Sequence, residues 1–257
     1  MARRVKYTAV VLAGSRPGRD PFAESFGTDL KALIPVGGEP MVARPVKTLL
    51  AAEDVGNIIV LTQAPERIGA VLPSDPRIRL RQSDATIAET MLALCFDKAT
   101  QWPLLVTTAD HALLDVETVD EFCAYAEGDI SIGVVEQRNL LKRFPHARRT
   151  WLKFRGGAFT GANLFALRTP QTAAAIELWR TVESDRKKGW RIISLLGPSV
   201  LLGVLLRVLS IDGALRHVGR KLGLDVRAVR LSNPLAGVDV DKSEDHDLAE
   251  AILAGRA

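Results

Sequence analysis

The sequence has little of several features that define common protein classes. Only two cysteines occur in 257 residues, Cys95 and Cys123, and they form no CxxC pair. We therefore expect two core cysteines in a reducing compartment, with no disulfide framework and no cysteine-based zinc site. Aromatic residues make up only 5% of the chain, which argues against a nucleic-acid partner bound by base stacking.

The chain also lacks two standard phosphate-binding strings and a clear membrane span. Neither GxxxxGK(S/T) nor GxGxxG is present, which excludes the usual P-loop and dinucleotide fingerprints. The segment 192–211 is strongly apolar, but Gly197-Pro198 and Arg207 interrupt it, so we do not expect a transmembrane helix. Residues 1–6 are basic and lead directly into the first apolar run without a signal segment, which predicts a cytoplasmic protein.

What is present fits a globular enzyme with small anionic substrates. The composition is 47% hydrophobic and 25% charged, with a net charge of +4, enough for a sizeable core and a mildly positive field. We predict one domain over residues 1–257, with a basic flap at 138–160 and a helical insertion at 184–224. The basic and Trp-containing part of the insertion, 186–221, has two interpretations. It packs on the core or on a second copy in a homodimer, which we favour, or it contacts a membrane or a membrane-bound partner.

Short apolar runs alternate with segments of helical periodicity along most of the chain. The runs predict strands at 9–12, 57–62, 77–80, 102–108, 129–135, 156–167 and 228–231. The periodic segments predict helices at 40–52, 65–72, 87–98, 117–127, 170–182 and 247–253. This order predicts an α/β protein with a doubly wound, mostly parallel sheet and right-handed crossovers. Ligands of such sheets bind at the carboxyl ends of the strands.

The stretch 8–38 contains the first candidate site. A buried strand leads into a glycine-rich loop with two arginines, and Lys31 follows. Such a loop brings backbone N–H groups and cations to phosphates, so we predict a phosphate site here. An ordinary surface turn with a solvated lysine is the alternative. The candidate residues are Leu12, Ala13, Gly14, Ser15, Arg16, Gly18, Arg19 and Lys31.

The same stretch resembles the signature of a known enzyme group. Nucleotidyltransferases related to molybdenum cofactor guanylyltransferase and to sugar-phosphate and polyol-phosphate cytidylyltransferases carry a strand, LAGG, a loop arginine, and PK-(A/L)-L-x-P-(V/I)-G-G-x-P-(M/L). Here the matching pieces are LAG at 12–14 and KALIPVGGEPM at 31–41. Ser15 replaces the second glycine and the loop is longer, so both Arg16 and Arg19 are candidates for the loop arginine. The resemblance implies a Rossmann-like, glycosyltransferase-A-type fold, NTP binding, and catalytic roles for Lys31 and the loop arginine.

Two acidic segments also match this group. Asp110 follows a continuous apolar strand, where a carboxylate can hold a cation or cap the next helix. The string at 237–245 resembles the family ending that supplies a second metal ligand, and Asp241 matches that ligand best. Asp239 is expected on the same strand face. The resemblance thus implies Mg²⁺ held by Asp110, Asp241 and Asp239. Ser243, which is followed by Glu244 and Asp245, is expected to cap the last helix.

Further candidates lie at a helix start and in the second half of the chain. The resemblance implies base and ribose contacts near Ser83, Thr86 and Thr90, although helix capping explains the first two equally well. Acceptor-binding candidates are Asn163, Gly161 and Lys153. For Asn163 the alternative is a turn-forming role, and for the basic flap that contains Lys153 it is a solvated surface.

Together these motifs imply a magnesium-dependent nucleotidyltransferase. It would join an NTP, GTP or CTP, to a phosphorylated acceptor and give a nucleoside-diphosphate conjugate and pyrophosphate. The acceptor is open among pterin, sugar phosphate and polyol phosphate. A non-catalytic relative that uses 186–221 to bind a membrane or a partner is the alternative. Both metal-type aspartates are present, which favours the enzyme, because a binding module has no reason to hold like charges close together.

Overall fold

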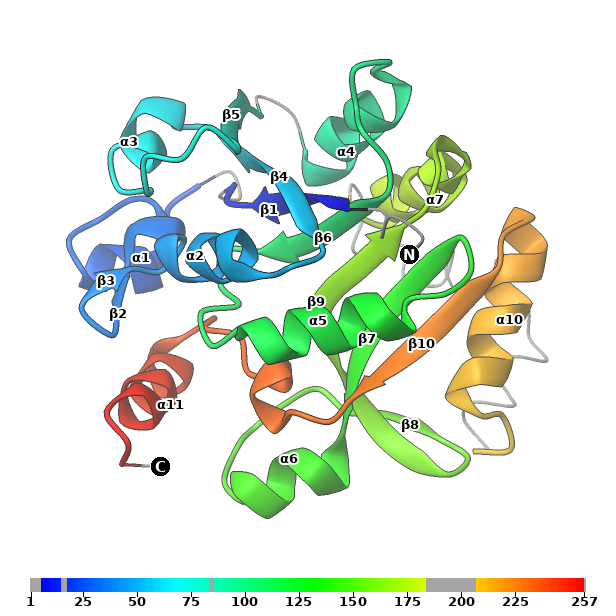
Figure 1. Ribbon diagram of the computed structural model, residues 1–257. Coiled ribbons are helices and arrows are strands. Elements are labelled where there is room, and N and C mark those ends of the chain that lie inside the picture. Colours follow the sequence, from blue (N-terminus) through cyan, green and yellow to red (C-terminus); the bar gives the residue numbers. More distant parts are fainter. Residues whose placement is uncertain (1–5, 15–17, 84–85, 184–206, 257) are drawn as a thin grey trace.

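The protein is a sheet with helices packed on its two faces (Figure 1). The computed structural model describes residues 6–14, 18–83, 86–183 and 207–256. The strands of the main sheet are β1 Tyr7–Leu12, β4 Val55–Thr62, β5 Ile78–Gln82, β6 Leu104–Thr108, β7 Ile130–Glu136, β8 Leu152–Phe154, β9 Gly157–Leu167 and β10 Val226–Leu231. Their order is β10-β7-β9-β6-β1-β4-β5, and β8 pairs with β9.

Most neighbouring strands of this sheet are parallel. β1 pairs in parallel with both β4 and β6, β4 with β5, and β7 with β10. β9 is the exception, because it lies between β6 and β7 and is antiparallel to both. The predicted doubly wound, mostly parallel architecture is therefore confirmed, with one reversed strand in its second half.

Most of the helices lie in the segments where the apolar pattern predicts them, but the helices at 21–25 and 137–143 were not predicted. The helices are α1 Pro21–Ser25, α2 Ala43–Ala51, α3 Pro65–Gly69, α4 Ile87–Phe96, α5 Val116–Tyr125, α6 Gln137–Arg143, α7 Ala173–Glu183, α10 Ile211–Leu222 and α11 Ser243–Leu253. Three short 3-10 helices, η1 Lys31–Leu33, η2 Pro170–Thr172 and η4 Pro234–Gly237, complete the described helical elements. Within the described residues, no helix has both the length and the apolar character needed to cross a membrane.

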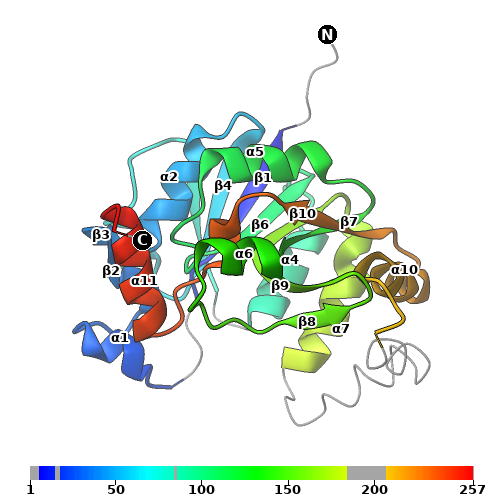
Figure 2. The same cartoon turned by 90° about the horizontal axis from the view of Figure 1, so that it is seen from below.

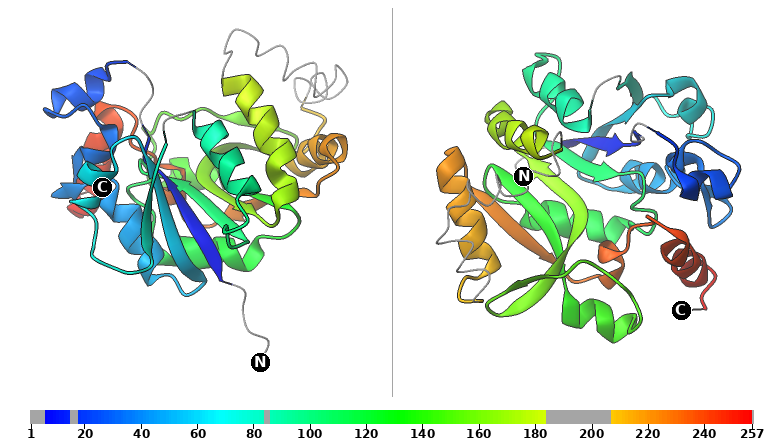
Figure 3. Two further views of the ribbon diagram at one scale, coloured as in Figure 1. Left: turned by 90° about the horizontal axis from the view of Figure 1, so that it is seen from above. Right: turned by 180° about the vertical axis from the view of Figure 1, so that it is seen from behind.

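Alternation along β1 divides the core into two layers. Ala9 and Val11 pack in one buried cluster with residues of α2 and α5, whereas Val10 and Leu12 pack in another with residues of α4. This is the period-two pattern of a strand buried on both faces. Figures 2 and 3 show α2 and α5 on one face of the sheet and α4, α7 and α10 on the other.

The signature forms a small hairpin, which corrects the predicted start of the first crossover helix. β2 (Pro35–Val36) pairs antiparallel with β3 (Glu39–Pro40), so the helix begins at Ala43 and not at residue 40. Gly37 and Gly38 form the turn with φ values of 62° and 80°, a left-handed conformation that suits glycine.

The end of the chain packs against this hairpin. The N–H of Gly37 donates to Glu250 Oε1 at 2.6 Å, and His246 Nε2 lies 2.8 Å from the carbonyl oxygen of Pro35. In Figure 1, α11 accordingly lies beside β2 and β3. Two segments more than 200 positions apart in the sequence thus meet at one edge of the sheet.

Two local predictions about this C-terminal segment were wrong. Residues 238–241 form an extended loop after η4, not a strand, so the expected strand face of Asp239 and Asp241 does not exist. Ser243 is the first residue of α11; Lys242 occupies the N-cap position, and no side chain caps this helix.

The predicted subdivisions of the chain remain predictions. The basic flap, 138–160, contains most of α6, β8 and the start of β9. Of the predicted insertion at 184–224, residues 184–206 lie outside the described residues, and the described part contains α10. The same limit applies to most of the 186–221 segment proposed for partner or membrane contact.

Candidate active site

Lys31 joins two aspartates from distant parts of the chain. Its Nζ donates to Asp110 Oδ2 at 2.8 Å and also to Asp241 Oδ1. Lys31 begins η1, Asp110 follows the carboxyl end of β6, and Asp241 lies in the loop before α11. Ligand groups in open α/β sheets lie at this edge, so we call Lys31, Asp110 and Asp241 the ionic centre.

Asp110 is not a helix cap. The cap of α5 is Asp115, whose Oδ1 accepts the Thr118 N–H at 2.8 Å. Asp110 is instead fixed by the Thr108 hydroxyl, which donates to Oδ1, and its backbone oxygen accepts the Val240 N–H at 2.9 Å. The second contact brings the loop that carries Asp241 next to the end of β6.

The attraction between Lys31 and the two aspartates determines the protonation states in the ionic centre. Burial alone would lower the pKa of Lys31, but the charges and hydrogen bonds of Asp110 and Asp241 outweigh burial and raise it. Burial likewise tends to raise the pKa of Asp241, but Lys31 outweighs this effect and the pKa falls below its usual value. Lys31 is therefore an ammonium and Asp241 a carboxylate at neutral pH.

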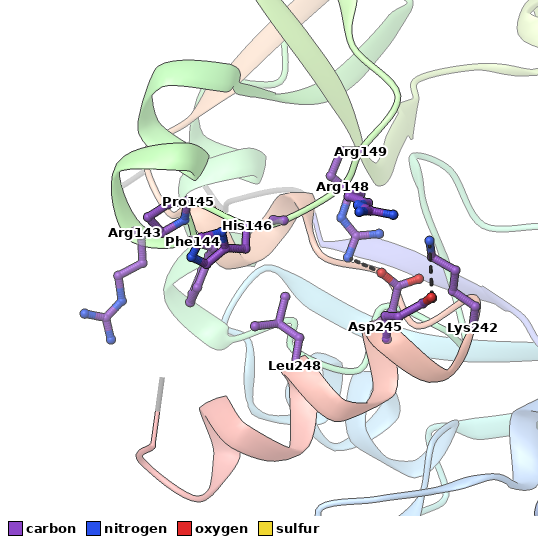
Figure 4. A pocket seen from close by; sticks show the side chains of 11 residues that line it. Arg143, Phe144, Pro145, His146, Arg148, Arg149, Lys242, Asp245 and Leu248 are labelled. Carbon is purple, nitrogen blue, oxygen red and sulfur yellow. Dashed lines mark ion pairs between the residues drawn. The ribbon is translucent and has the colours of Figure 1, made fainter.

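Arg149 is a positioning residue of the candidate site that the sequence did not single out. Its side chain is only 8% exposed, and it bridges Asp239 Oδ1 at 2.6 Å and Asp245 Oδ1 at 3.0 Å. Asp245 Oδ2 in turn accepts the backbone N–H of Asp241 at 3.3 Å. Figure 4 shows Arg149 and Asp245 meeting across the start of α11. Arg149 thus anchors the loop that carries Asp241.

The pocket drawn in Figure 4 lies beside this anchor and has a volume of about 400 Å³. Its walls come from the segment after α6 and from the first turns of α11, and they include Arg148, Arg149 and Lys242. The charged run at 138–155 therefore has two kinds of residue. Arg149 is a buried structural ion, whereas Arg148 is an exposed one.

Asp239 and Asn163 form the other side of the Arg149 contact. Asn163 Nδ2 donates to Asp239 Oδ2 at 3.3 Å, so each oxygen of this carboxylate has a protein partner. Burial raises the pKa of Asp239, the charges of Asp241 and Asp110 add to the increase, and the Arg149 guanidinium opposes it. A direct metal-binding role of Asp239 stays a prediction.

The phosphate-loop candidates are described only in part. Ser15 and Arg16 lie outside the described residues. Arg19 is 87% exposed and pairs with Glu24 at 2.6 Å, so its charge is directed to a neighbour on α1. The remaining loop candidates, Leu12, Ala13, Gly14 and Gly18, belong to β1, follow it directly or lie in the glycine turn before α1.

The helix-start candidates divide into one cap and one buried pair. Thr86 caps α4, because its hydroxyl accepts the Glu89 N–H at 3.2 Å and the Glu89 carboxylate accepts the Thr86 N–H at 3.1 Å. Ser83 and Thr90 are buried and their hydroxyls lie 2.6 Å apart. Their contact with a nucleotide base therefore stays a prediction.

The acceptor candidates differ in how close they lie to the ionic centre. Asn163 donates to Asp239, which lies two positions before Asp241 in the same loop. Gly161 is exposed on β9 opposite Val134 of β7. Lys153 is exposed on β8, the strand at the margin of the sheet. The structure brings Asn163 to the site, whereas roles for Gly161 and Lys153 remain predictions.

The donor set of the ionic centre fits Mg²⁺. Asp110 and Asp241 lie within hydrogen-bond distance of one cation, the Lys31 ammonium, so their oxygens converge on one position. Mg²⁺ prefers hard oxygen ligands and is commonly held by one or two carboxylates together with phosphates and water. No cluster of three or more His, Cys, Asp or Glu ligands occurs in the described ranges.

A family comparison decides the class of this protein. The model of the MobA-like NTP transferase domain matches residues 9–192, more than half of the chain. The chain belongs to this family. It is accordingly an enzyme of the nucleotidyltransferase class, as the signature at 31–41 predicts. No curated protein sequence matches the chain.

Solved structures agree with this assignment. A hypothetical transferase from Thermus thermophilus is 31% identical with a TM-score of 0.80, and the match covers 94% of this chain and 100% of that one. 4-Diphosphocytidyl-2C-methyl-D-erythritol synthase from Anaerococcus prevotii is 12% identical with a TM-score of 0.61, over 98% and 100% of the two chains. CMP:2-keto-3-deoxy-manno-octonic acid synthetase, solved with CTP, is 12% identical with a TM-score of 0.60, also over 98% and 100%. The last two show that the fold is shared.

Proposed function

We propose that this nucleotidyltransferase is magnesium-dependent and joins GTP or CTP to a phosphorylated acceptor, with release of pyrophosphate. The observation that carries the proposal is the convergence of Lys31, Asp110 and Asp241 from three distant segments at the carboxyl edge of the sheet. Like charges held this close destabilise a fold unless a cation occupies the space between them. Such an arrangement suits charge neutralisation during phosphoryl chemistry.

The reaction needs positioning more than covalent catalysis. An oxygen of the acceptor phosphate attacks the α-phosphorus of the NTP in line, and the bond from this phosphorus to the β-phosphate oxygen breaks. The electron pair leaves with pyrophosphate. Lys31 would turn from the carboxylates to a phosphate oxygen and balance the charge that moves onto the leaving group.

Asp110 and Asp241 would hold the metal ion, which when bound supplies Lewis-acid stabilisation of phosphate charge. The Thr108 hydroxyl orients the Asp110 carboxylate, and the Arg149–Asp245 pair fixes the backbone of Asp241. The protein's own contribution is therefore to keep two carboxylates and one ammonium within a few ångströms before substrates arrive. Preorganised charge of this kind typically contributes more to the rate than any other single effect.

The proposal is tested by pyrophosphate release. Each of the four NTPs with Mg²⁺ is combined with a panel of phosphorylated sugars, polyols, alkyl phosphates and molybdopterin. We expect release with GTP or CTP and one acceptor class, and none with Asp110→Ala. Silence across the panel although nucleotide binds, or equal release by Asp110→Ala, would contradict the proposal.

A further inference from the structure

A second cavity borders the ionic centre through Thr108, which lines the cavity and whose hydroxyl donates to Asp110. Its volume is about 510 Å³, and it lies on the face of the sheet that α4, α7 and α10 flank. Ile176 of α7, Phe165 of β9 and Leu215 of α10 represent its walls. Among the described residues that line it, none is charged, and all are apolar except Thr108 and Asn163.

Both polar residues of this cavity are linked to the acidic site. The Thr108 hydroxyl donates to Asp110, and the Asn163 amide donates to Asp239 at 3.3 Å. The cavity therefore has one polar end, at the carboxylates, and an apolar body that extends away from them between α7 and α10. This division matches a ligand with a charged head and a hydrocarbon body.

Asn163 is held in a conformation that needs a local reason. Its φ is 47°, a left-handed value that is uncommon for most residues other than glycine but that asparagine adopts more readily. It lies in a strand whose pairing with β7 is irregular between Ile132 and Val134. Strain of this kind collects at ligand sites, where surrounding contacts enforce it. Here the contact is the bond to Asp239, which directs the amide to the border between cavity and carboxylates.

We propose that this cavity binds the apolar part of the acceptor, and that the acceptor is a phosphate monoester with a hydrocarbon group. The inference rests on the proposed function, which places the acceptor phosphate at the ionic centre. A nucleotide base or a polyol would leave several polar atoms unpaired against the apolar walls, at a large cost in affinity. A hydrocarbon chain loses nothing there and gains from leaving water.

A homologous series of soluble alkyl phosphates, from ethyl to octyl and below micelle-forming concentrations, tests the proposal on the unmodified protein. With GTP or CTP and Mg²⁺, we expect kcat/KM to rise about fourfold for each added CH₂ group until the cavity is full. The same lipids in vesicles provide a separate arm, and a rise only there would assign the acceptor to a membrane surface. No dependence on chain length in either arm would overturn the proposal.

A matched pair of variants on one helix localises the effect. Ala175 lines the cavity, whereas the adjacent Ala174 is exposed on α7. Ala175→Phe should weaken binding of octyl phosphate at least about tenfold and leave ethyl phosphate unchanged, because the ring fills the cavity. Ala174→Phe, with the same helix-propensity cost, should behave like the unmodified protein. Equal loss in both variants would contradict the assignment.

Binding by calorimetry, without NTP, separates this proposal from the proposed function. If octyl phosphate binds and Ala175→Phe weakens this binding while no NTP reacts, the cavity does bind a hydrocarbon phosphate, but the transferase proposal fails and the ligand is not its acceptor. If polyol phosphates are converted but octyl phosphate does not bind, the enzyme stands and the cavity proposal is overturned.

Discussion

The ionic centre and the 510 Å³ cavity share a border but are built in opposite ways. The centre consists of charged side chains from three segments far apart in the sequence, whereas the cavity has no charged side chain among its described walls. The centre therefore depends on long-range loop packing, and the cavity on the apolar faces of neighbouring helices and strands. We infer that the first determines the reaction and the second the acceptor.

The largest expected effect comes from the ionic centre. Asp110→Asn removes the charge but keeps the size of the side chain, so the fold and its melting temperature should change little. Turnover should fall by at least about a hundredfold, because a preorganised charge at the reacting phosphate is lost. The rate of pyrophosphate release at saturating substrate concentrations measures this loss of turnover.

The matched control is Asp247→Asn on α11, where the carboxylate is 84% exposed. It removes the same formal charge away from the site and should leave turnover unchanged. If both variants lose activity equally, net charge and not the ionic centre controls the reaction.

A smaller effect on activity and a large one on stability are expected at Arg149. Arg149→Ala leaves the buried Asp245 and the partly buried Asp239 without their cation and should lower the free energy of unfolding by about 3 kcal/mol. Arg148→Ala serves as the control, since Arg148 is exposed. Urea unfolding measures the free energy of unfolding of both variants. A cost below about 0.5 kcal/mol for Arg149→Ala would show that the buried network is not an anchor.

Asn163 lies at the border of the two regions. Two substitutions there distinguish the energetic cost of its backbone conformation from the contribution of its hydrogen bond to Asp239. Both Asn163→Ala and Asn163→Gly lose the bond to Asp239, but only glycine accepts the left-handed φ without cost. We expect Asn163→Gly to be more stable than Asn163→Ala by about 1 kcal/mol in urea unfolding. Equal stability of the two variants would mean that the backbone at this position is unstrained.

The smallest effect concerns the reactivity of Cys95, which lies on α4 in the apolar cluster between this helix and the sheet. Burial raises the pKa of the Cys95 thiol to about 11, against the opposing effect of a hydrogen bond with Thr172. The thiol is thus neutral at pH 8, and its alkylation by iodoacetamide should be about a hundredfold slower than in the unfolded chain. Mass spectrometry of the modified peptide measures this ratio. Equal rates in folded and unfolded protein would show that water reaches this cluster.

The sequence predicted the parts of the site that local patterns encode. Asp110 could be found because an apolar strand ends just before it, and carboxyl ends of parallel strands meet at one edge. Lys31 and Asp241 could be found because the short sequences around them, 31–41 and 237–245, resemble family signatures. The sheet order followed from alternating periodicities, although nothing in the strand at 156–167 signalled that it runs antiparallel.

The rest depended on contacts between distant residues. Arg149 looked like one member of a solvated basic run, and only its packing against Asp239 and Asp245, about 90 positions away, makes it a buried anchor. Asp239 was expected to share a strand face with Asp241, but the extended loop directs it to Arg149 and Asn163 instead. The cavity was not predicted, because an apolar helix face does not reveal from sequence what it faces.

The central claim is that the ionic centre transfers a nucleotidyl group. The most direct measurement follows radioactive phosphorus from the α-position of GTP or CTP, with Mg²⁺ and octyl phosphate or another phosphorylated acceptor from the panel. We predict that the label appears in a nucleoside-diphosphate conjugate, only with Mg²⁺, and that Asp110→Asn abolishes the transfer. Label that stays in the NTP or appears only as free nucleoside monophosphate, although both substrates bind, would contradict the account.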